Sequence, residues 1–150
     1  MREIMFRGKR IDNGEWVDGH YHCTDYIWRG EEIRKHYILP QNAGDAYAVI
    51  PETVGQYTGM TDKNGKKIFE GDIIKSDNGK QSAISVVKFG EYYPKMFYKM
   101  LDMFDPGRKK LPAVGVHAKS VDKGEEMILF QSPCVTVIGN IHDNPNLVET

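Results

Sequence analysis

Apolar and polar residues alternate over short stretches from the start of the chain, and this pattern predicts β-strands. Ile4 and Phe6 alternate with Met5 and Arg7, residues 12–15 (DNGE) form a turn signal, and the apolar pattern returns at Trp16. Residues 3–22 are therefore predicted to form a β-hairpin. Two further short strands are expected at residues 33–39 and 47–50, the second ended by a proline that cannot donate to a central ladder. Residues 21–28 are aromatic and mixed, and their pattern favours no assignment.

The stretch from residue 54 to residue 76 organises the rest of the chain. Asn64-Gly65 is a strong hairpin signal, because both residues tolerate the positive φ of a type I′ turn. Gly71 interrupts the following apolar run, so we expect a bend there and a new strand from Asp72. A further turn at residues 77–80 and a β-branched strand at residues 83–89 follow. This order is typical of the start of a small SH3-like barrel, and any β-meander is the simpler alternative.

The period of the apolar residues changes after residue 89. Apolar residues share one face at helical spacing over the next segment, and they are Met96, Phe97, Met100, Leu101 and Phe104. The spacing predicts a short helix over residues 94–104, which the Asp105-Pro106-Gly107 sequence ends. We expect its apolar face to pack on the barrel; a partner-binding helix is the alternative, since methionine suits adaptable contacts.

The last third of the chain is again β-prone. Strands are expected at residues 111–118, 127–130 and 134–141. Gly19 and Gly139 lie inside predicted strands, where a glycine marks a bulge or a close approach of another backbone. With a soft boundary at Pro51-Glu52-Thr53, the predicted organisation is a hairpin region over residues 1–52 and an SH3-like barrel domain over residues 53–150. The fold class is mainly β with one short inserted helix.

Charge and composition narrow the functional classes. The 20 Lys and Arg residues nearly balance the 21 Asp and Glu residues, which argues against a dedicated nucleic-acid binder. No apolar run approaches the ~18 residues that a membrane-spanning helix needs, and the first ten residues lack the apolar core of a signal peptide. We therefore expect a cytoplasmic protein in which Cys23 and Cys134 are reduced thiols.

Three blocks of the sequence resemble a known family. They are MREIMFRGKRIDNGEWVDG at the start, IPETVGQYTGMTDKNGKKIFEGDIIK in the middle and VIGNIHDNPNLV near the end. Together they resemble the YopX-like family of phage and prophage proteins. The resemblance implies a small, mostly β protein with an SH3-type barrel, carried by phages and integrated prophages of bacteria. The family has no established catalytic activity to carry over to this chain, and no functional residue transfers from it.

Candidate catalytic and metal-binding residues have simple structural explanations. His20 and His22 share a face of a strand and could both reach one metal, with His36 as a third ligand, but ordinary polar and aromatic side chains of a hairpin are the favoured explanation. Cys134 with His117 or His142 could form a nucleophile–base pair, yet a thiol in an apolar strand is usually a small buried residue. We therefore expect no enzyme activity, no metal and no cofactor.

Basic residues near the turns are the candidate binding residues: Lys63, Lys66, Lys67, Arg108, Lys109 and Lys110. They could contact phosphates, although exposed lysines at hairpin ends also keep strand edges from pairing with other chains. The sequence favours a non-catalytic protein-interaction or assembly module, with a phage or host protein as partner or with self-association as a homo-oligomer. The alternative is a nucleic-acid-binding accessory protein of phage.

Overall fold

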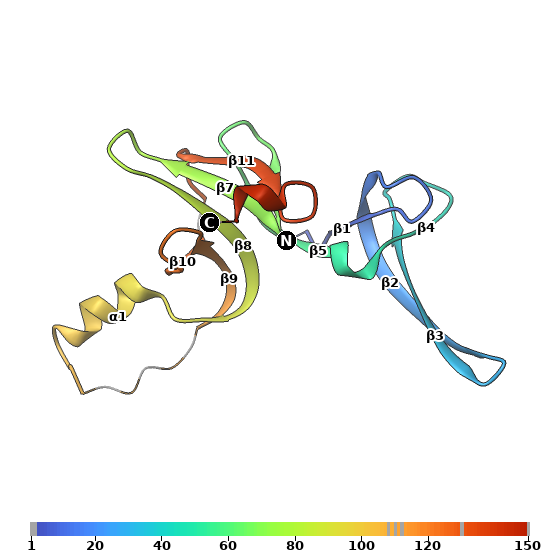
Figure 1. The fold of residues 1–150 in the computed structure, drawn as a ribbon, viewed down its shortest axis with the longest axis horizontal. Helices are drawn as coiled ribbons and strands as arrows, with labels where there is room; N and C mark the ends of the chain where they lie inside the picture. Colours follow the sequence, from blue (N-terminus) through green and yellow to red (C-terminus); the bar gives the residue numbers. More distant parts are fainter. Residues whose placement is uncertain (1–2, 108, 110, 112, 130, 150) are drawn as a thin grey trace. The chain divides into compact units, whose positions relative to one another are not determined.

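The computed structural model describes residues 3–107, 109, 111, 113–129 and 131–149, with the backbone only at residues 95–98. The described chain is mainly β, as predicted, and divides into two compact units, Met1–Gly59 and Met60–Thr150. The predicted boundary at residues 51–53 falls on a short 3-10 helix, η1 (Pro51–Thr53). Each unit is described by itself below (Figure 1).

The first unit is an antiparallel sheet. Its strands, in the order β4-β3-β2-β1-β5, are β4 (Tyr47–Ala48), β3 (Glu31–Leu39), β2 (Trp16–Trp28), β1 (Phe6–Lys9) and the first part of β5 (Gly55–Thr61). Ile38 and Val49 are almost fully buried. A Cβ atom at Gly8 would lie 3.1 Å from the Cβ of Val49, so Gly8 lets β1 pack closely against these two side chains.

The predicted hairpin at residues 3–22 is confirmed. β1 pairs with β2 from Phe6 opposite Gly19 to Lys9 opposite Trp16. A Cβ atom at Gly19 would lie 2.1 Å from the backbone oxygen of Leu39, so this glycine does mark a close backbone approach.

The second unit contains a five-stranded antiparallel sheet in the order β10-β9-β8-β7-β11. The strands are β7 (Asp72–Asp77), β8 (Ser82–Tyr92), β9 (Ala113–Ser120), β10 (Glu126–Ile128) and β11 (Val135–Asn140), and β6 (Lys67–Phe69) precedes them. Its core consists of Ile68, Ile74, Val87, Ala118 and Val135. No strand pairing among the described residues closes this sheet into a barrel, so the SH3-like part of the prediction is not confirmed.

The turn that follows β5 differs from its prediction. Gly65 has a φ of 80°, but Asn64 does not have positive φ, so the turn is not of type I′. The carboxylate of Asp62 holds the turn instead, because it accepts hydrogen bonds from the amides of Asn64 (2.8 Å) and Lys66 (3.0 Å). Its other oxygen accepts the amide of Val137 in β11 at 3.0 Å. A side chain therefore stabilises this turn in place of the backbone conformation expected of Asn-Gly.

The glycines expected to shape strands in this unit do so. Gly71 has a φ of 86°, and β7 starts at the next residue, as predicted. The pairing of β11 with β7 shifts register between Val137 and Gly139, so Gly139 marks a bulge. The bulge brings the Oδ1 of Asn144 within 2.5 Å of the position of a Cβ atom at Gly139.

The predicted helix is present as α1 (Lys95–Asp102), with Pro94 as its N-cap residue. At its C-terminal end Met100, Met103 and Phe104 are exposed, and Phe104 retains 83% of its accessible surface. Met100 and Phe104 of the predicted apolar face therefore do not pack on the sheet as expected, whereas Leu101 of the same face is half-buried. Met96 and Phe97 lie where side chains are not described. In the described part of the chain no helix is long and apolar enough to cross a membrane.

Candidate interaction surface

Strands β2 and β3 extend beyond the rest of the first sheet as a two-stranded ribbon. β1 pairs with β2 only up to Gly19, and β4 pairs with β3 only at Tyr37 and Ile38. β2 and β3 stay paired with each other out to Trp28 opposite Glu31. Residues 20–36, here called the β-arm, therefore project without further strand neighbours among the described residues (Figure 1).

The tip of the β-arm is apolar and exposed. Arg29 and Gly30 both have positive φ, 53° and 83°, as in the two-residue type I′ turn that suits a twisted hairpin. The residues before this turn keep much of their surface accessible: 41% for Tyr26, 72% for Ile27 and 60% for Trp28. Adjacent large apolar side chains exposed together are typical of a contact surface, whereas scattered single ones are not.

Cross-strand contacts hold the β-arm together. Arg34 donates two hydrogen bonds to the carboxylate of Asp25, at 2.6 and 3.0 Å. These bonds hold the pKa of Asp25 below its ordinary value. Nearer the base, the rings of His22 and Tyr37 stack at a centroid distance of 5.3 Å. Because a two-stranded ribbon alone is only marginally stable in water, these contacts matter more here than they would inside a larger sheet.

The β-arm does not assemble the metal site considered from the sequence. His20 and His22 share one face of the ribbon, as the spacing predicted, but His36 pairs with Cys23 on the opposite face. His36 instead lies 2.6 Å, through its Nδ1, from the hydroxyl of Tyr21. Among the described residues no three His, Cys, Asp or Glu side chains gather as a metal-binding group. Both cysteines are free thiols.

The candidate basic residues lie on two segments of the second unit. Lys63 and Lys66 are exposed on the turn after β5, and Lys67 is half-buried in β6. Lys109 is exposed and follows α1, a helix that lies away from the turn after β5 (Figure 1). Arg108 and Lys110 lie outside the described residues. The described lysines therefore do not form one patch, and their role in binding remains a prediction.

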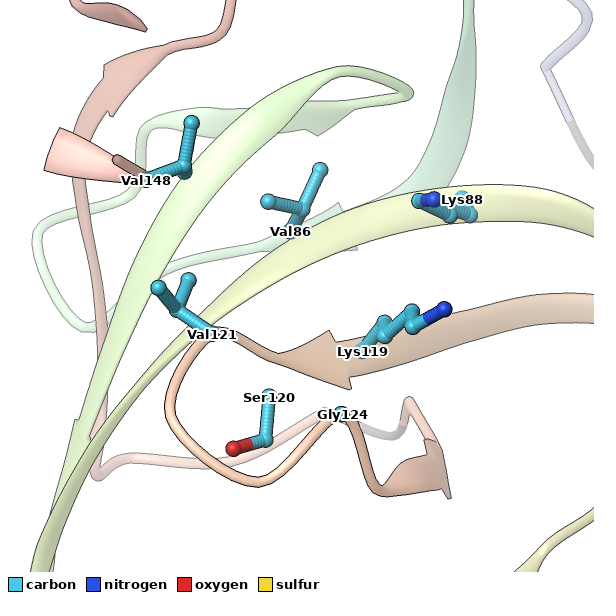
Figure 2. A pocket seen from close by; sticks show the side chains of 7 residues that line it. All are labelled: Val86, Lys88, Lys119, Ser120, Val121, Gly124 and Val148. Carbon is cyan, nitrogen blue, oxygen red and sulfur yellow. The ribbon is translucent and has the colours of Figure 1, made fainter. Parts of the chain in front are cut away.

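A small hollow of about 210 Å³ lies on the second unit, at the end of β9. Val86 lies between an apolar side of the hollow, formed by Val121 and Val148, and a basic side, formed by Lys88 and Lys119 (Figure 2). The volume is below the ~300–1,000 Å³ of most small-molecule sites.

The one hydroxyl that lines the hollow is already engaged. Ser120 donates its hydroxyl to the carboxylate of Asp122 and accepts the amide of Lys123 at 3.3 Å. The hydrogen bond from the Ser120 hydroxyl lowers the pKa of the Asp122 carboxyl group. This arrangement closes the turn after β9 and offers no activated nucleophile.

Comparison with known proteins gives the family. The family model described as YopX protein matches residues 5–149, nearly the whole chain. The chain belongs to the YopX family. This confirms the resemblance carried by the three sequence blocks. No curated protein matches this YopX chain.

Among solved structures, this YopX protein is similar to the crystal structure of protein EF1440 from Enterococcus faecalis. The identity is 20%, the match covers 99% of this chain and 100% of the other, and the TM-score is 0.49. A likeness of this degree says nothing about function.

Sequence reasoning missed the β-arm as a functional candidate. Residues 21–28 carried no clear period, since both faces of a projecting ribbon are exposed and neither needs to be apolar. One signal was available. The polar stretch at residues 29–32 precedes the strand predicted at residues 33–39, and the Arg29-Gly30 pair within it forms the hairpin turn.

Proposed function

We propose that this YopX protein is a non-catalytic interaction or assembly module of phages and prophages that works through its β-arm. The observation that carries the proposal is the exposed apolar tip formed by Tyr26, Ile27 and Trp28, at the end of a ribbon that pairs with no further strand of the described chain. Large aromatic side chains dominate the energetics of protein interfaces. A rigid two-residue turn presents them without a long flexible loop, which lowers the entropic cost of binding.

The proposed partner is a phage or host protein in the bacterial cytoplasm, or another copy of the chain. The near-balance of 20 basic and 21 acidic residues supports a protein partner over a nucleic acid. The separation of the lysines after β5 from the segment after α1 supports the same choice, because phosphate binding favours clustered cations.

Affinity purification from phage-infected host cells, with and without nuclease treatment, tests this proposal. We expect a retained protein that survives nuclease and is lost with Trp28→Ser. Phe104→Ser is the matched control, since Phe104 is an aromatic residue of the second unit that is even more exposed than Trp28, and it should leave retention unchanged. Retention that depends on nucleic acid, or that Trp28→Ser leaves intact, would contradict the proposal.

A further inference from the structure

The outer edge of β3 is open over five residues. β2 pairs with the inner edge of β3 along its whole length, from Glu31 to Leu39. On the outer edge β4 pairs only with Tyr37 and Ile38, and the amide of Val49 donates to the carbonyl of His36 at 3.0 Å. Residues 31–35 therefore present unpaired backbone groups within the described part of the chain. Such an edge is a template for another strand.

The backbone fixes which residues face outward. The bond from Val49 shows that the carbonyl of His36 faces the outer edge, and backbone groups alternate sides along a strand. Arg34 and Glu32 consequently also point their N–H and C=O groups outward, whereas Ile33 points its own toward β2. An antiparallel partner strand forms its hydrogen-bonded pairs with Glu32 and Arg34.

The charges of the open edge have opposite signs on the two sides of its central residue. The edge reads Glu31-Glu32-Ile33-Arg34-Lys35, two acids, one apolar residue and two bases. In the described chain neither glutamate has a cationic partner. Lys35 lies over the ring of Tyr26 at 5.9 Å and has no carboxylate partner there either. Arg34 already pairs with Asp25, so Glu31, Glu32 and Lys35 are the charges without an ion-pair partner in the described chain.

We propose that a second copy of this chain pairs with this edge, β3 against β3 about a two-fold axis, with Ile33 opposite Ile33 of the partner copy. In that register Glu32 lies opposite Arg34 of the other copy, and Glu31 lies opposite Lys35. The neighbouring registers allowed by the backbone centre instead on Glu32 or on Arg34. They place like charges directly opposite one another, which is destabilising in a sheet.

The same register arranges the side chains on both faces of the resulting four-stranded sheet. Tyr26 lies opposite Ile33 within each arm, so one face gains an unbroken apolar row of Tyr26 and Ile33 from both copies. On the other face Arg34 lies between Asp25 of its own arm and Glu32 of the partner copy. A contact in which the same patch serves both copies is the commonest form of dimer.

This pairing rests on the proposed function and names its partner as the chain itself. The test is sedimentation velocity of the full chain over a range of concentrations, comparing wild type with Glu31→Lys and Lys35→Glu. These substitutions spare the Asp25–Arg34 pair. Wild type should shift with concentration toward twice the 17.1 kDa chain mass. Each single variant should dimerise at least tenfold more weakly, because it places like charges opposite one another at both ends of the pair.

An equimolar mixture of the two variants should restore dimerisation. Position 31 of the Glu31→Lys chain then faces position 35 of the Lys35→Glu chain, so opposite charges meet again at both ends of the pair. Recovery in the mixture separates a specific register from damage to the fold. A wild type that stays monomeric, single variants that dimerise normally, or a mixture without recovery would each overturn the pairing.

Cross-linking provides an independent measure of the register. In a background without Cys23 and Cys134, Ile33→Cys should oxidise to a disulfide-linked dimer, since residues directly opposite in an antiparallel pair lie within disulfide range. Lys35→Cys is the control, because position 35 lies opposite position 31 of the partner copy and the two introduced thiols are therefore too far apart to form a disulfide. Equal rates of cross-linking for the two variants would overturn the register. If the chain stays monomeric in sedimentation but still retains a protein through Trp28 in affinity purification, the self-pairing is wrong and the proposed function is unaffected.

Discussion

The buried carboxylate of Asp62 is expected to contribute strongly to the stability of the second unit. The side chain is 4% exposed and accepts three backbone amides, those of Asn64, Lys66 and Val137. The last of these joins the turn after β5 to β11 across 75 residues of sequence. Asp62→Ala removes all three acceptors at once.

The expected loss of unfolding free energy depends on which hydrogen-bond acceptor replaces the carboxylate at each amide after the substitution. The turn residues Asn64 and Lys66 are exposed, so water can replace the carboxylate there at a cost of about 0.5–1 kcal/mol each. The amide of Val137 is half-buried within the bulged strand, where an unsatisfied donor costs about 1–3 kcal/mol. We therefore expect the free energy of unfolding of this unit to fall by about 3 kcal/mol, a large part of a typical domain's stability of roughly 5–15 kcal/mol.

The pH dependence provides the second part of this prediction. Burial acts to raise the pKa of Asp62, but the bonds from Val137, Lys66 and Asn64 outweigh it and hold the pKa below its ordinary value. A carboxyl group with a depressed folded-state pKa stabilises the protein above its unfolded-state pKa, and this contribution is lost as pH falls through the folded-state pKa. The difference between wild type and Asp62→Ala should thus be constant near neutral pH and shrink in acid, below pH ~4.

Urea unfolding followed by far-UV circular dichroism measures this effect. Both tryptophans, Trp16 and Trp28, lie in the first unit, so their fluorescence reports separately on that unit and should change little. Asp105→Ala is the matched control, because Asp105 is exposed in the same unit. A loss below about 1 kcal/mol, or a difference that persists unchanged in acid, would refute the assignment of Asp62 as the clamp of this turn.

Three further outcomes are expected. Gly19→Ala should lower the free energy of unfolding of the first unit, followed by tryptophan fluorescence, by more than ~2 kcal/mol, because its Cβ would meet the backbone of Leu39; an unchanged free energy would contradict the close approach. Gly71→Ala should cost only about 1–2 kcal/mol by urea unfolding, since its positive φ is strained for alanine but the added atom meets only ordinary contacts; a larger loss would indicate a packing clash. In an NMR titration the carboxyl of Asp25 should titrate below its ordinary pKa and return toward that value in Arg34→Gln, whereas an unchanged titration would show that the ion pair is not formed in solution.

The sequence alone determined the class of elements and most of their limits. Alternation, turn residues and helical spacing are local properties, so the hairpin at residues 3–22, the new strand at Asp72 and the helix near residues 95–102 followed from them. The glycines at positions 19 and 139 were also identified as sites of close approach or bulging, because a glycine weakens a strand and often marks such a site.

Only the tertiary structure decided how the strands associate and which surfaces remain open. Asp62 holds its turn through an amide 75 residues away, a contact that the local Asn-Gly signal could not reveal. The length of the β-arm depends on where β1 and β4 stop pairing, and residues 20–36 carry no local mark of that limit. A strand edge is open only where no neighbouring strand pairs with it, and this depends on the pairing of the whole sheet.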